Sequence, residues 1–314
     1  MSDVAHDRPR PTSSDAYHVT VVVLSWNGKD DTLRCLASLQ QAEHVPLTVV
    51  VVDNGSVDGS PDAVATSFPD VVLVRLDHNS GFSGGVNTGI AAALERGATA
   101  VLLLNNDMVV EAGFIAPLLA VLEASPRAAA VCSQILFTDT PERIWYAGAS
   151  FRPTRGHHGR NIGFGDPPLA PGTPPYEVDC ACGGAMLIPA DAIAEVGLFD
   201  EELFAYREDL DWSLRARAGS RSILVAPGSV VRHHVSASSG GESSPTSLYY
   251  DLRNGLTVAE RHAPLAPFAT WLRRVESLLA HAAQALLSSR RRRGLNAVFE
   301  GWRDFRHGRL GPRR

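Results

Sequence analysis

The first third of the chain alternates between apolar runs and segments whose mixed composition is compatible with helices. The apolar runs cover residues 19–24, 48–52, 71–76 and 101–104, and the segments between them cover residues 30–41, 61–68 and 84–96. A continuous apolar run is typical of a strand that is buried on both faces. Strands that alternate with helices form right-handed βαβ units, which build parallel sheets. The pattern therefore predicts an α/β fold in which a central, mostly parallel sheet is flanked by helices.

Each apolar run stops in a cluster of polar, turn-forming residues. The clusters are residues 25–28, 53–56, 77–81 and 105–107. Parallel strands place their carboxyl ends at one edge of the sheet, where open α/β folds bind ligands. Asp107 follows two asparagines, and a carboxylate beside amide side chains suits a divalent cation that holds nucleotide phosphates. The alternative for Asp107 is a helix cap in a strand-to-helix turn.

A second acidic cluster lies in residues 199–212, before a helix-forming stretch that Gly219 closes. Asp209 and Asp211 lie near the start of this helix, where the helix dipole favours a charged carboxylate. A charged aspartate that faces a cleft can accept a proton from a substrate hydroxyl. Helix capping together with a solvated acidic face explains the same spacing, so both interpretations stay open.

Two further positions carry metal-binding or phosphate-binding chemistry. His233 and His234 follow a short apolar stretch, and neutral imidazole is a common metal ligand. Adjacent strand residues point to opposite faces, so at most one of the two histidines faces a site. Arg253, on a predicted helix, could bind a phosphate through its planar guanidinium. Taken singly, such residues are more often structural.

Length and charge narrow the class of protein. The chain has 314 residues, enough for one large α/β domain with additions, and its formal net charge of −5 argues against bulk nucleic-acid binding. No stretch supplies the ~18 consecutive apolar residues that a membrane-spanning helix needs.

Residues 1–16 are polar and are predicted to be a disordered lead-in without a signal peptide.

The four cysteines, Cys35, Cys132, Cys180 and Cys182, are predicted to be buried or half-buried thiols. Their spacing matches neither a disulfide framework nor a zinc knuckle. Unpaired thiols are typical of a reducing compartment, so we expect a cytoplasmic protein.

Several short motifs between residues 19 and 254 occur in a recognisable order. They are residues 22–28, 51–56, 78–89, 105–107, 183–185, 208–211, 233–238 and 253–254. With these motifs in this order, the chain resembles family 2 glycosyltransferases of the GT-A fold, in the branch of bacterial rhamnosyltransferases that extend cell-surface polysaccharide. The resemblance implies a glycosyltransferase domain at 17–255, with a nucleotide-binding half at 17–110 and an acceptor half at 111–255, followed by a helical, Arg-rich extension at 256–314.

The resemblance implies a nucleotide-sugar donor and a divalent metal, Mg²⁺ or Mn²⁺. Asp53 corresponds to the carboxylate that contacts the base or ribose, and Asn79 begins the loop that closes over the donor. Asp107 corresponds to the last acidic residue of the DxD motif, which holds the metal on the diphosphate, although Asn105 replaces the usual first aspartate. The expected donor-binding residues are Ser25, Asn27, Asp53, Asn79, Gly81, Phe82, Asn105, Asn106 and Arg253.

The resemblance also implies that Asp209 is the general base of an inverting transfer to a glycan or polyprenyl-diphosphate-linked acceptor. The acceptor hydroxyl then displaces the nucleoside diphosphate in line, while metal and cations stabilise the leaving group. His233, with His234 as the alternate, matches the late metal-ligating histidine, and Arg253 completes the diphosphate clamp. The first expected donor is dTDP-rhamnose. The acceptor-side candidates are Glu208, Asp211 and Trp212.

Three other functions fit parts of the sequence. A Rossmann dehydrogenase could use Asp53 for a ribose, but its G-x-G-x-x-G fingerprint is missing after the first strand. A sugar-phosphate nucleotidyltransferase needs a Gly-rich loop at that place, whereas the glycines here follow the third strand. A non-catalytic sugar-binding module of the same fold would not need Asp107, Asp209 and Arg253 together.

The segment after residue 255 is predicted to be helical and rich in arginine. Residues 271–287 form a helix-compatible stretch, and residues 290–314 carry nine arginines against Glu300 and Asp304, interleaved with aromatic residues. This composition is typical of a helix in an anionic membrane interface. An amphipathic helix packed on the catalytic domain explains it equally well. Peripheral contact with the inner face of the cell membrane is expected under the first interpretation.

Overall fold

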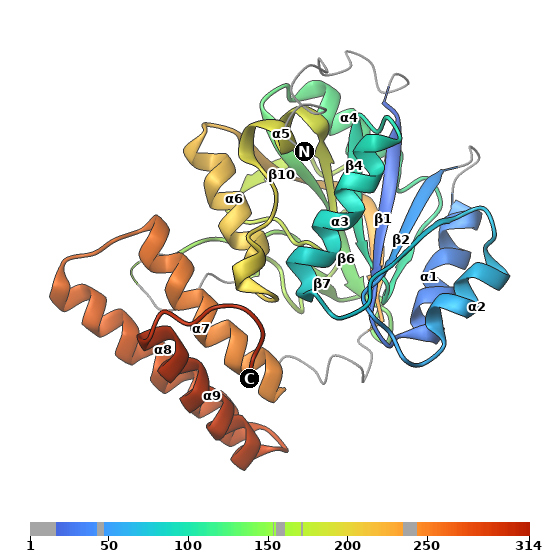
Figure 1. The fold of residues 1–314 in the computed structure, drawn as a ribbon. Helices are drawn as coiled ribbons and strands as arrows, with labels where there is room; N and C mark the ends of the chain where they lie inside the picture. The colour runs from blue at the N-terminus through green and yellow to red at the C-terminus, as the bar shows by residue number, and fades with distance from the viewer. Residues whose placement is uncertain (1–16, 43–46, 153, 155–160, 171, 235–243) are drawn as a thin grey trace.

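The computed structural model of the protein describes residues 17–42, 47–152, 154, 161–170, 172–234 and 244–314. Within these residues a ten-stranded sheet forms the centre of the molecule, in the order β3-β2-β1-β4-β9-β6-β10-β5, with β7 paired to β6 and β8 paired to β10. Helices pack against the sheet, and three long C-terminal helices form a layer beside it (Figure 1). The predicted lead-in at residues 1–16 lies outside the described residues.

The strands and helices predicted from the first third of the chain are present. The strands run parallel and are β1 (Val19–Ser25), β2 (Thr48–Asp53), β3 (Val72–Arg75) and β4 (Ala100–Asn105). The helices between them are α1 (Lys29–Ala42), α2 (Ser60–Ser67) and α3 (Gly81–Glu95). Nearly all residues of β1 and β4 are buried, which explains why these strands are mostly apolar. The α/β fold predicted from the sequence is confirmed.

The second half of the chain extends the same sheet. β6 (Ala128–Phe137) and β10 (Ser222–His233) run parallel to each other, and β9 (Ala185–Pro189) lies antiparallel between β4 and β6. One sheet therefore spans both halves that the sequence suggested. The short strands are β5 (Met108–Val110), β7 (Ile144–Tyr146) and β8 (Tyr176–Val178), and the helical elements are α4 (Ile115–Ala124), α5 (Ala190–Val196), the 3-10 turn η2 (Glu201–Leu203) and α6 (Glu208–Ala218).

The C-terminal layer has a hydrophobic core of its own. It consists of α7 (Pro245–His262), α8 (Pro267–Leu287) and α9 (Arg291–Arg306). Trp302 and Phe305 of α9 pack against this core, so these two aromatic residues follow the packed-helix interpretation. Across the described ranges, no helix combines the length and the apolar character that crossing a bilayer requires. The buried residues of this core are Leu248, Leu252, Leu256, Ala285 and Val298.

The cysteines are unpaired, as the sequence predicts. Cys35, Cys132 and Cys180 are buried and Cys182 is half-buried. Burial raises the pKa of the Cys132 thiol to about 12 and that of the Cys180 thiol well above its usual range. Thiols that stay protonated at neutral pH are poor nucleophiles, so these side chains have packing roles.

Candidate active site

The carboxyl ends of neighbouring strands bring two predicted carboxylates to one edge of the sheet. β1 lies between β2, which ends in Asp53, and β4, which leads into Asp107. Asp53 is buried, and its Oδ2 accepts a hydrogen bond from Ser56 N at 3.1 Å. The other carboxylate oxygen of Asp53, Oδ1, is buried without a hydrogen-bond partner, and so is Oδ1 of Asp107. Each carboxylate therefore keeps one oxygen for a ligand.

Asp107 faces His233 at the end of β10. β5 pairs with β10 so that Met108 lies opposite His233, and Asp107 Oδ2 is 3.2 Å from His233 Nε2. Trp145 of β7 packs edge-on against the imidazole, with ring centroids 4.4 Å apart. The second ring nitrogen of His233, Nδ1, is buried without a partner. The structure thus brings together the two residues predicted to bind a metal, and Trp145 orients one of them.

The donor atoms at this edge fit a divalent cation. Carboxylate oxygens suit Mg²⁺ and Mn²⁺, and an imidazole nitrogen in the same site favours the transition metal Mn²⁺. In the part of the chain that the structure describes, no group of three or more His, Cys, Asp or Glu residues could hold a metal. The protein alone would thus supply two metal ligands at this edge, Asp107 and His233. A bound diphosphate could supply the others. His234 lies instead beside Asp31, with its Nδ1 3.2 Å from Asp31 Oδ1, so the geometry selects His233.

A network of amide side chains shapes the loop after β3. Asn54 Nδ2 donates to Asn79 Oδ1 and to the carbonyl oxygen of Gly81, and Asn54 Oδ1 accepts from Ser80 N. Gly81 has a φ of +79°, and a Cβ there would collide with the backbone of Phe204, so only glycine fits. Sequence reasoning did not single out Asn54, because its partners lie 25 or more residues further along the chain.

Three predicted donor-binding residues hold the turn after β1. Ser25 Oγ lies 2.8 Å from Thr32 Oγ1, and Asn106 Nδ2 donates to the same hydroxyl at 3.0 Å. Asn27 has a φ of +49°, and its Oδ1 accepts a hydrogen bond from Val57 N at 2.9 Å. These contacts fix the start of α1 against the ends of β2 and β4. The shape of this edge of the sheet depends on them.

A short segment, residues 182–184, links the end of β4 to the acidic pair, Glu208 and Asp209. Asn105 N donates to Gly184 O at 3.1 Å, and Gly183 N donates to Asp209 Oδ2 at 3.5 Å. A Cβ at Gly183 would lie 2.9 Å from the ring of Phe82, so ring and backbone are in close contact. Phe82, Asn105 and Asp209, which are far apart in the sequence, are therefore gathered around one segment.

Glu208 and Asp209 are adjacent carboxyl groups in a poorly solvated place. Burial and the charge of Asp209 raise the pKa of Glu208 to about 8. Burial also raises the pKa of Asp209, while the charge of Arg207 and backbone hydrogen bonds oppose that shift. Oε2 of Glu208 is buried without a partner. Burial and the neighbouring charge therefore favour a proton on Glu208 near neutral pH.

Glu208→Gln is expected to change how the stability of the protein depends on pH. A carboxyl whose pKa rises from 4.5 to about 8 on folding binds a proton in the folded state that the unfolded state has released. The wild-type free energy of unfolding should therefore fall, relative to that of Glu208→Gln, as the pH rises through this interval. The loss is about 1.4 kcal/mol per pH unit at most. Urea denaturation at several pH values measures it.

The exposed Glu142→Gln provides the matched control for this experiment. The free energy of unfolding of this variant, plotted against pH, should run parallel to that of the wild type over the same pH range. If the Glu208→Gln curve also ran parallel, Glu208 would have an ordinary pKa and would not hold a proton near neutral pH.

The loop that leads into α6 has an uncommon backbone. Phe204, Tyr206 and Arg207 have φ values of +68°, +65° and +76°, a region that bulky residues rarely adopt. Asn254 Nδ2 donates to the carbonyl oxygens of three loop residues at 2.8 to 2.9 Å. Strained backbone persists only where its surroundings determine it, and it concentrates at functional sites. Asn254 of α7 is thus a positioning residue for the loop that carries the acidic pair.

Arg253 supports the same loop. It is completely buried, and its three guanidinium nitrogens donate to Asn254 Oδ1, Leu203 O and Gly311 O. The guanidinium also lies 4.9 Å from the ring centroid of Tyr250. This placement differs from the predicted diphosphate clamp, because the hydrogen bonds of Arg253 are made inside the protein. The sequence could not distinguish the two roles, since both require an arginine on this helix.

Asp211 and Trp212 are also engaged in packing. Burial would raise the pKa of Asp211, but hydrogen bonds from His262 and Arg215 lower it. Trp212 is buried, and its Nε1 donates to Gly197 O. Neither side chain is available to an acceptor in this conformation, which corrects the expectation for both. Of the three acceptor-side candidates, Glu208 alone remains beside Asp209 with a buried oxygen that has no partner.

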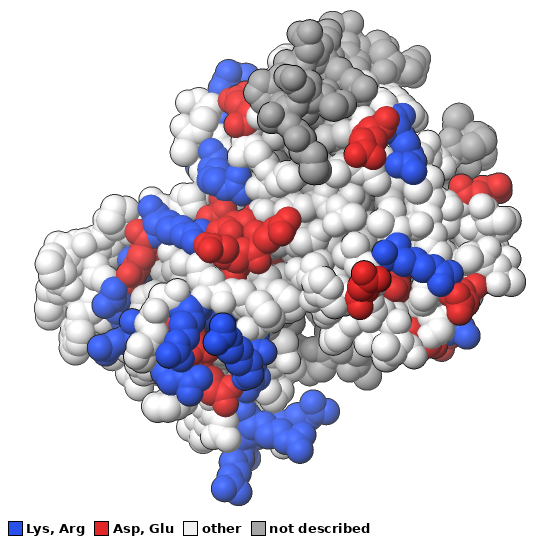
Figure 2. Space-filling view, in the orientation of Figure 1, with Lys and Arg blue, Asp and Glu red and all other residues white. Residues whose placement is uncertain are grey.

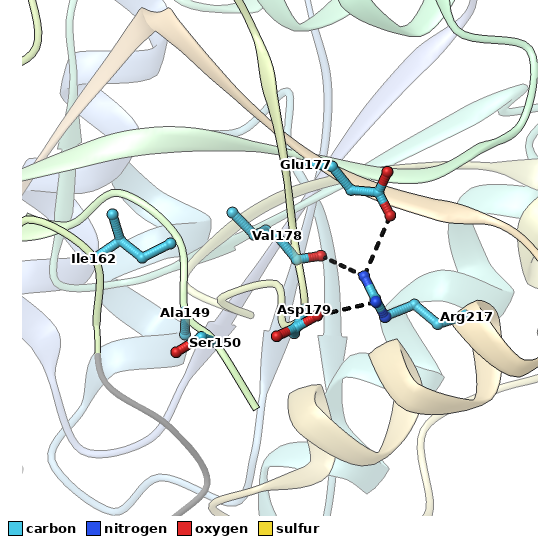
Figure 3. Close-up of a pocket in the computed structure, with 7 residues that line it drawn as sticks. All are labelled: Ala149, Ser150, Ile162, Glu177, Val178, Asp179 and Arg217. Carbon is cyan, nitrogen blue, oxygen red and sulfur yellow. Dashed lines mark hydrogen bonds and ion pairs between the residues drawn. The ribbon is translucent and has the colours of Figure 1, made fainter. Parts of the chain in front are cut away.

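A separate hollow lies between β8 and α6 (Figure 3). Arg217 donates to Glu177 and to the carbonyl oxygen of Val178, and it pairs with Asp179 at 3.0 Å. Arg217 therefore contacts both carboxylates of this hollow, and no predicted site residue lines it. The lining residues are Ala149, Ser150, Ile162, Glu177, Val178, Asp179 and Arg217.

Buried, unpartnered carboxylate oxygens mark the site. Across the described residues, such oxygens occur on Asp53, Asp107 and Glu208. Buried polar atoms in proteins are almost always hydrogen-bonded, and exceptions call for an explanation such as a missing ligand or ion. All three residues were selected from the sequence as site candidates. These oxygens lie at the edge of the sheet and in the acidic pair, the two places where the sequence predicts a binding site.

Residues 20–196 match the sequence pattern described as Glycosyl transferase family 2. The chain belongs to this family. The glycosyltransferase is 30% identical to the N-acetylglucosaminyl-diphospho-decaprenol L-rhamnosyltransferase of Mycobacterium tuberculosis over 297 residues, which cover 87% of this chain and 95% of the relative. It is 23% identical to the dTDP-rhamnosyl transferase RfbF of Shigella flexneri over 260 residues, which cover 79% and 82%. The rhamnosyltransferase-like branch predicted from the motifs is confirmed.

The fold of this glycosyltransferase also resembles that of solved structures. A crystal structure of GalNAc-T7 with UDP, GalNAc and Mn²⁺ superimposes with a TM-score of 0.59 at 17% identity. The similarity covers 93% of this chain and 56% of that one, so this chain spans about half the length of GalNAc-T7. The predicted GT-A fold is confirmed. As a glycosyltransferase, the protein is neither a dehydrogenase, nor a nucleotidyltransferase, nor a non-catalytic module.

Proposed function

We propose that this glycosyltransferase moves rhamnose from dTDP-rhamnose to a polyprenyl-diphosphate-linked sugar, with inversion and with a divalent metal. The observation that carries the proposal is the set of three buried, unpartnered carboxylate oxygens on Asp53, Asp107 and Glu208. Donor and acceptor are inferred from relatives, of which one is named an N-acetylglucosaminyl-diphospho-decaprenol L-rhamnosyltransferase and one a dTDP-rhamnosyl transferase.

The donor would lie along the carboxyl ends of β1, β2 and β4. Asp53 offers its Oδ1 to the base or ribose, and Asn79, Gly81 and Phe82 form the loop that covers the sugar. Asp107 and His233 are the residues that would hold the metal, which fits their unpartnered atoms. A bound Mn²⁺ or Mg²⁺ neutralises charge on the departing diphosphate. Asn105 and Asn106 precede Asp107, and their hydrogen bonds to Gly184 and Thr32 shape this edge of the site.

Asp209 would take the proton of the acceptor hydroxyl while that oxygen attacks the anomeric carbon. The bond to the nucleoside diphosphate breaks on the opposite face, so the configuration inverts. Glu208 keeps its own proton near neutral pH, because a second negative charge beside Asp209 in a buried place is unfavourable. In this proposal Asp209 is the charged member of the pair and acts as the base.

Thermal unfolding in the presence of nucleotide sugars tests the donor and the metal. A ligand that binds only the folded state at 100 times its dissociation constant stabilises that state by about 2.7 kcal/mol, which raises the melting temperature by several degrees. We expect this rise with dTDP-rhamnose and Mn²⁺, and little with EDTA. UDP-N-acetylglucosamine and GDP-mannose serve as controls. A larger rise with either control would overturn the donor assignment, and an equal rise in EDTA would overturn the metal.

The lipid-linked acceptor places the reaction at a membrane surface. We propose that the protein works at the cytoplasmic face of the cell membrane in peripheral contact with it. The unpaired thiols and the composition of the C-terminal segment support this location.

A further inference from the structure

The residues of α8 that are classed as exposed are all apolar. Phe268 and Leu287, near its two ends, are 73% and 88% exposed, and its charged residues Arg273, Arg274 and Glu276 are buried or half-buried. Contiguous apolar surface of this extent on a folded domain indicates an interaction site. The exposed residues of the helix are Pro267, Phe268, Trp271, Leu272, Leu279, Ala283, Leu286 and Leu287.

These side chains form one stripe along the helix. Phe268, Leu272, Leu279 and Leu286 are spaced by four, seven and seven residues, which places them on the same face. The rings of Phe268 and Trp271 stack with centroids 6.0 Å apart at one end of the stripe. Phe299 on the neighbouring α9 is 66% exposed and is apolar as well. We call this surface the α8 face.

Four consecutive arginines, residues 290–293, follow the α8 face at the turn between α8 and α9. All four are exposed. Lys and Arg side chains project at the lower end of the α8–α9 hairpin (Figure 2). The acidic residues of α9 do not offset this charge, because Glu300 pairs with Arg313, and Asp304 pairs with Arg303 and Arg309. The end of the hairpin is therefore strongly basic.

We propose that the α8 face and arginines 290–293 dock the protein on an anionic lipid surface, with α8 lying in the interface. An apolar helical face beside clustered arginines matches the acyl boundary and the charged headgroups of such a surface. Of the aromatic residues that the sequence placed in this basic segment, Trp302 and Phe305 pack inward, whereas α8 and Phe299 supply exposed apolar side chains. The purpose of this docking rests on the proposed lipid-linked acceptor.

A chain of contacts connects the docking surface to the loop before the acidic pair. Gly294, just after the arginines, packs against the side chain of Leu248 on α7. The next residues of α7 include Tyr250, whose ring stacks with those of Phe204 and Tyr206 at 5.6 and 6.3 Å. Those two residues belong to the loop that leads into Glu208. A lipid-linked acceptor at this surface would therefore approach the base from the side of α7.

Co-sedimentation with vesicles tests the proposal, in the absence of nucleotide. The vesicles contain phosphatidylcholine alone or with phosphatidylglycerol. We expect binding to the anionic vesicles only, and loss of that binding in high salt, where the screening length falls to about 3 Å at 1 M. Replacing arginines 290–293 by glutamine should weaken binding by about 100-fold or more. Phe268→Ser with Leu287→Ser should weaken it by roughly tenfold or more.

Matched controls carry the same changes elsewhere on the surface. They are Phe164→Ser, at a ring that is 47% exposed, and the glutamine variant of Arg75, Arg96, Arg143 and Arg152. Both controls should bind as the wild type does. Absence of binding, or equal loss in test and control variants, would overturn the proposal. So would light scattering that shows a dimer dissociated by the Phe268 and Leu287 changes. Failure here leaves the nucleotide-sugar melting experiment unaffected, so the two proposals fail separately.

Discussion

Asp209→Asn is expected to lower the rate of glycosyl transfer by about 10²- to 10⁴-fold, the usual contribution of a positioned general base. Asparagine keeps the shape of the side chain and its contact with Gly183 but cannot take a proton. Affinity for the nucleotide sugar should stay close to that of the wild type. Steady-state kinetics measure the first effect, and nucleotide titration measures the second.

The pH profile gives a further readout for Asp209. Burial raises its pKa, so the wild-type rate should fall as the pH drops through that raised value, while the residual rate of Asp209→Asn should lack this limb. Asp211→Asn is the matched control, because it removes an ion pair with Arg215 and a contact with His262. That variant should melt at a lower temperature and retain its turnover. A large loss of rate in Asp211→Asn and a normal rate in Asp209→Asn would show that the base is misplaced.

Asp107→Asn is expected to weaken metal-dependent binding of the donor by more than about 100-fold. Loss of a residue that merely orients a metal ligand typically costs 10- to 100-fold in metal affinity, and loss of a direct ligand should cost more. Paramagnetic resonance of free Mn²⁺ measures metal binding without any assay of activity. Circular dichroism should show an unchanged fold, because the carboxylate oxygen Oδ1 has no partner in the protein.

The adjacent histidines provide the control for this experiment. His233→Gln should weaken Mn²⁺ binding, since His233 Nε2 lies 3.2 Å from Asp107 Oδ2. His234→Gln should leave Mn²⁺ binding intact, since His234 lies beside Asp31. Unchanged binding in both Asp107→Asn and His233→Gln would place the metal elsewhere.

The nucleotide-binding part of the fold was predictable because its signals are local. Residues 101–104 are all apolar and become the centre of β4, which is buried on both faces, and the polar residues after them stop the strand. The position of β9 between β4 and β6 was not predictable. Its pairing joins Leu102 to Leu187 and Val131 to Leu187, and no local pattern encodes contacts over such a distance.

Residue types at the site were predictable, but the atoms they contact were not. A buried aspartate after a strand predicts a ligand-binding carboxylate, and Asp53 and Asp107 fulfil the structural part of that prediction. Arg253 has the right chemistry for a phosphate, yet its direction depends on a loop about 50 residues earlier. Asn54 was not selected from the sequence because asparagine is common in turns, so its presence after a strand needs no functional explanation.

The support of the loop before α6 has a consequence for synthesis on the ribosome. Arg253 Nη1 donates to the carbonyl oxygen of Gly311, Gly311 N donates to that of Glu202, and Arg313 N donates to the hydroxyl of Tyr250. The segment that carries the acidic pair is therefore translated long before the residues that complete its support. A nascent chain that has not yet emerged as far as residue 313 lacks these contacts. The contacts that residues 311–313 make with this support can therefore form only after nearly the whole chain has been synthesised.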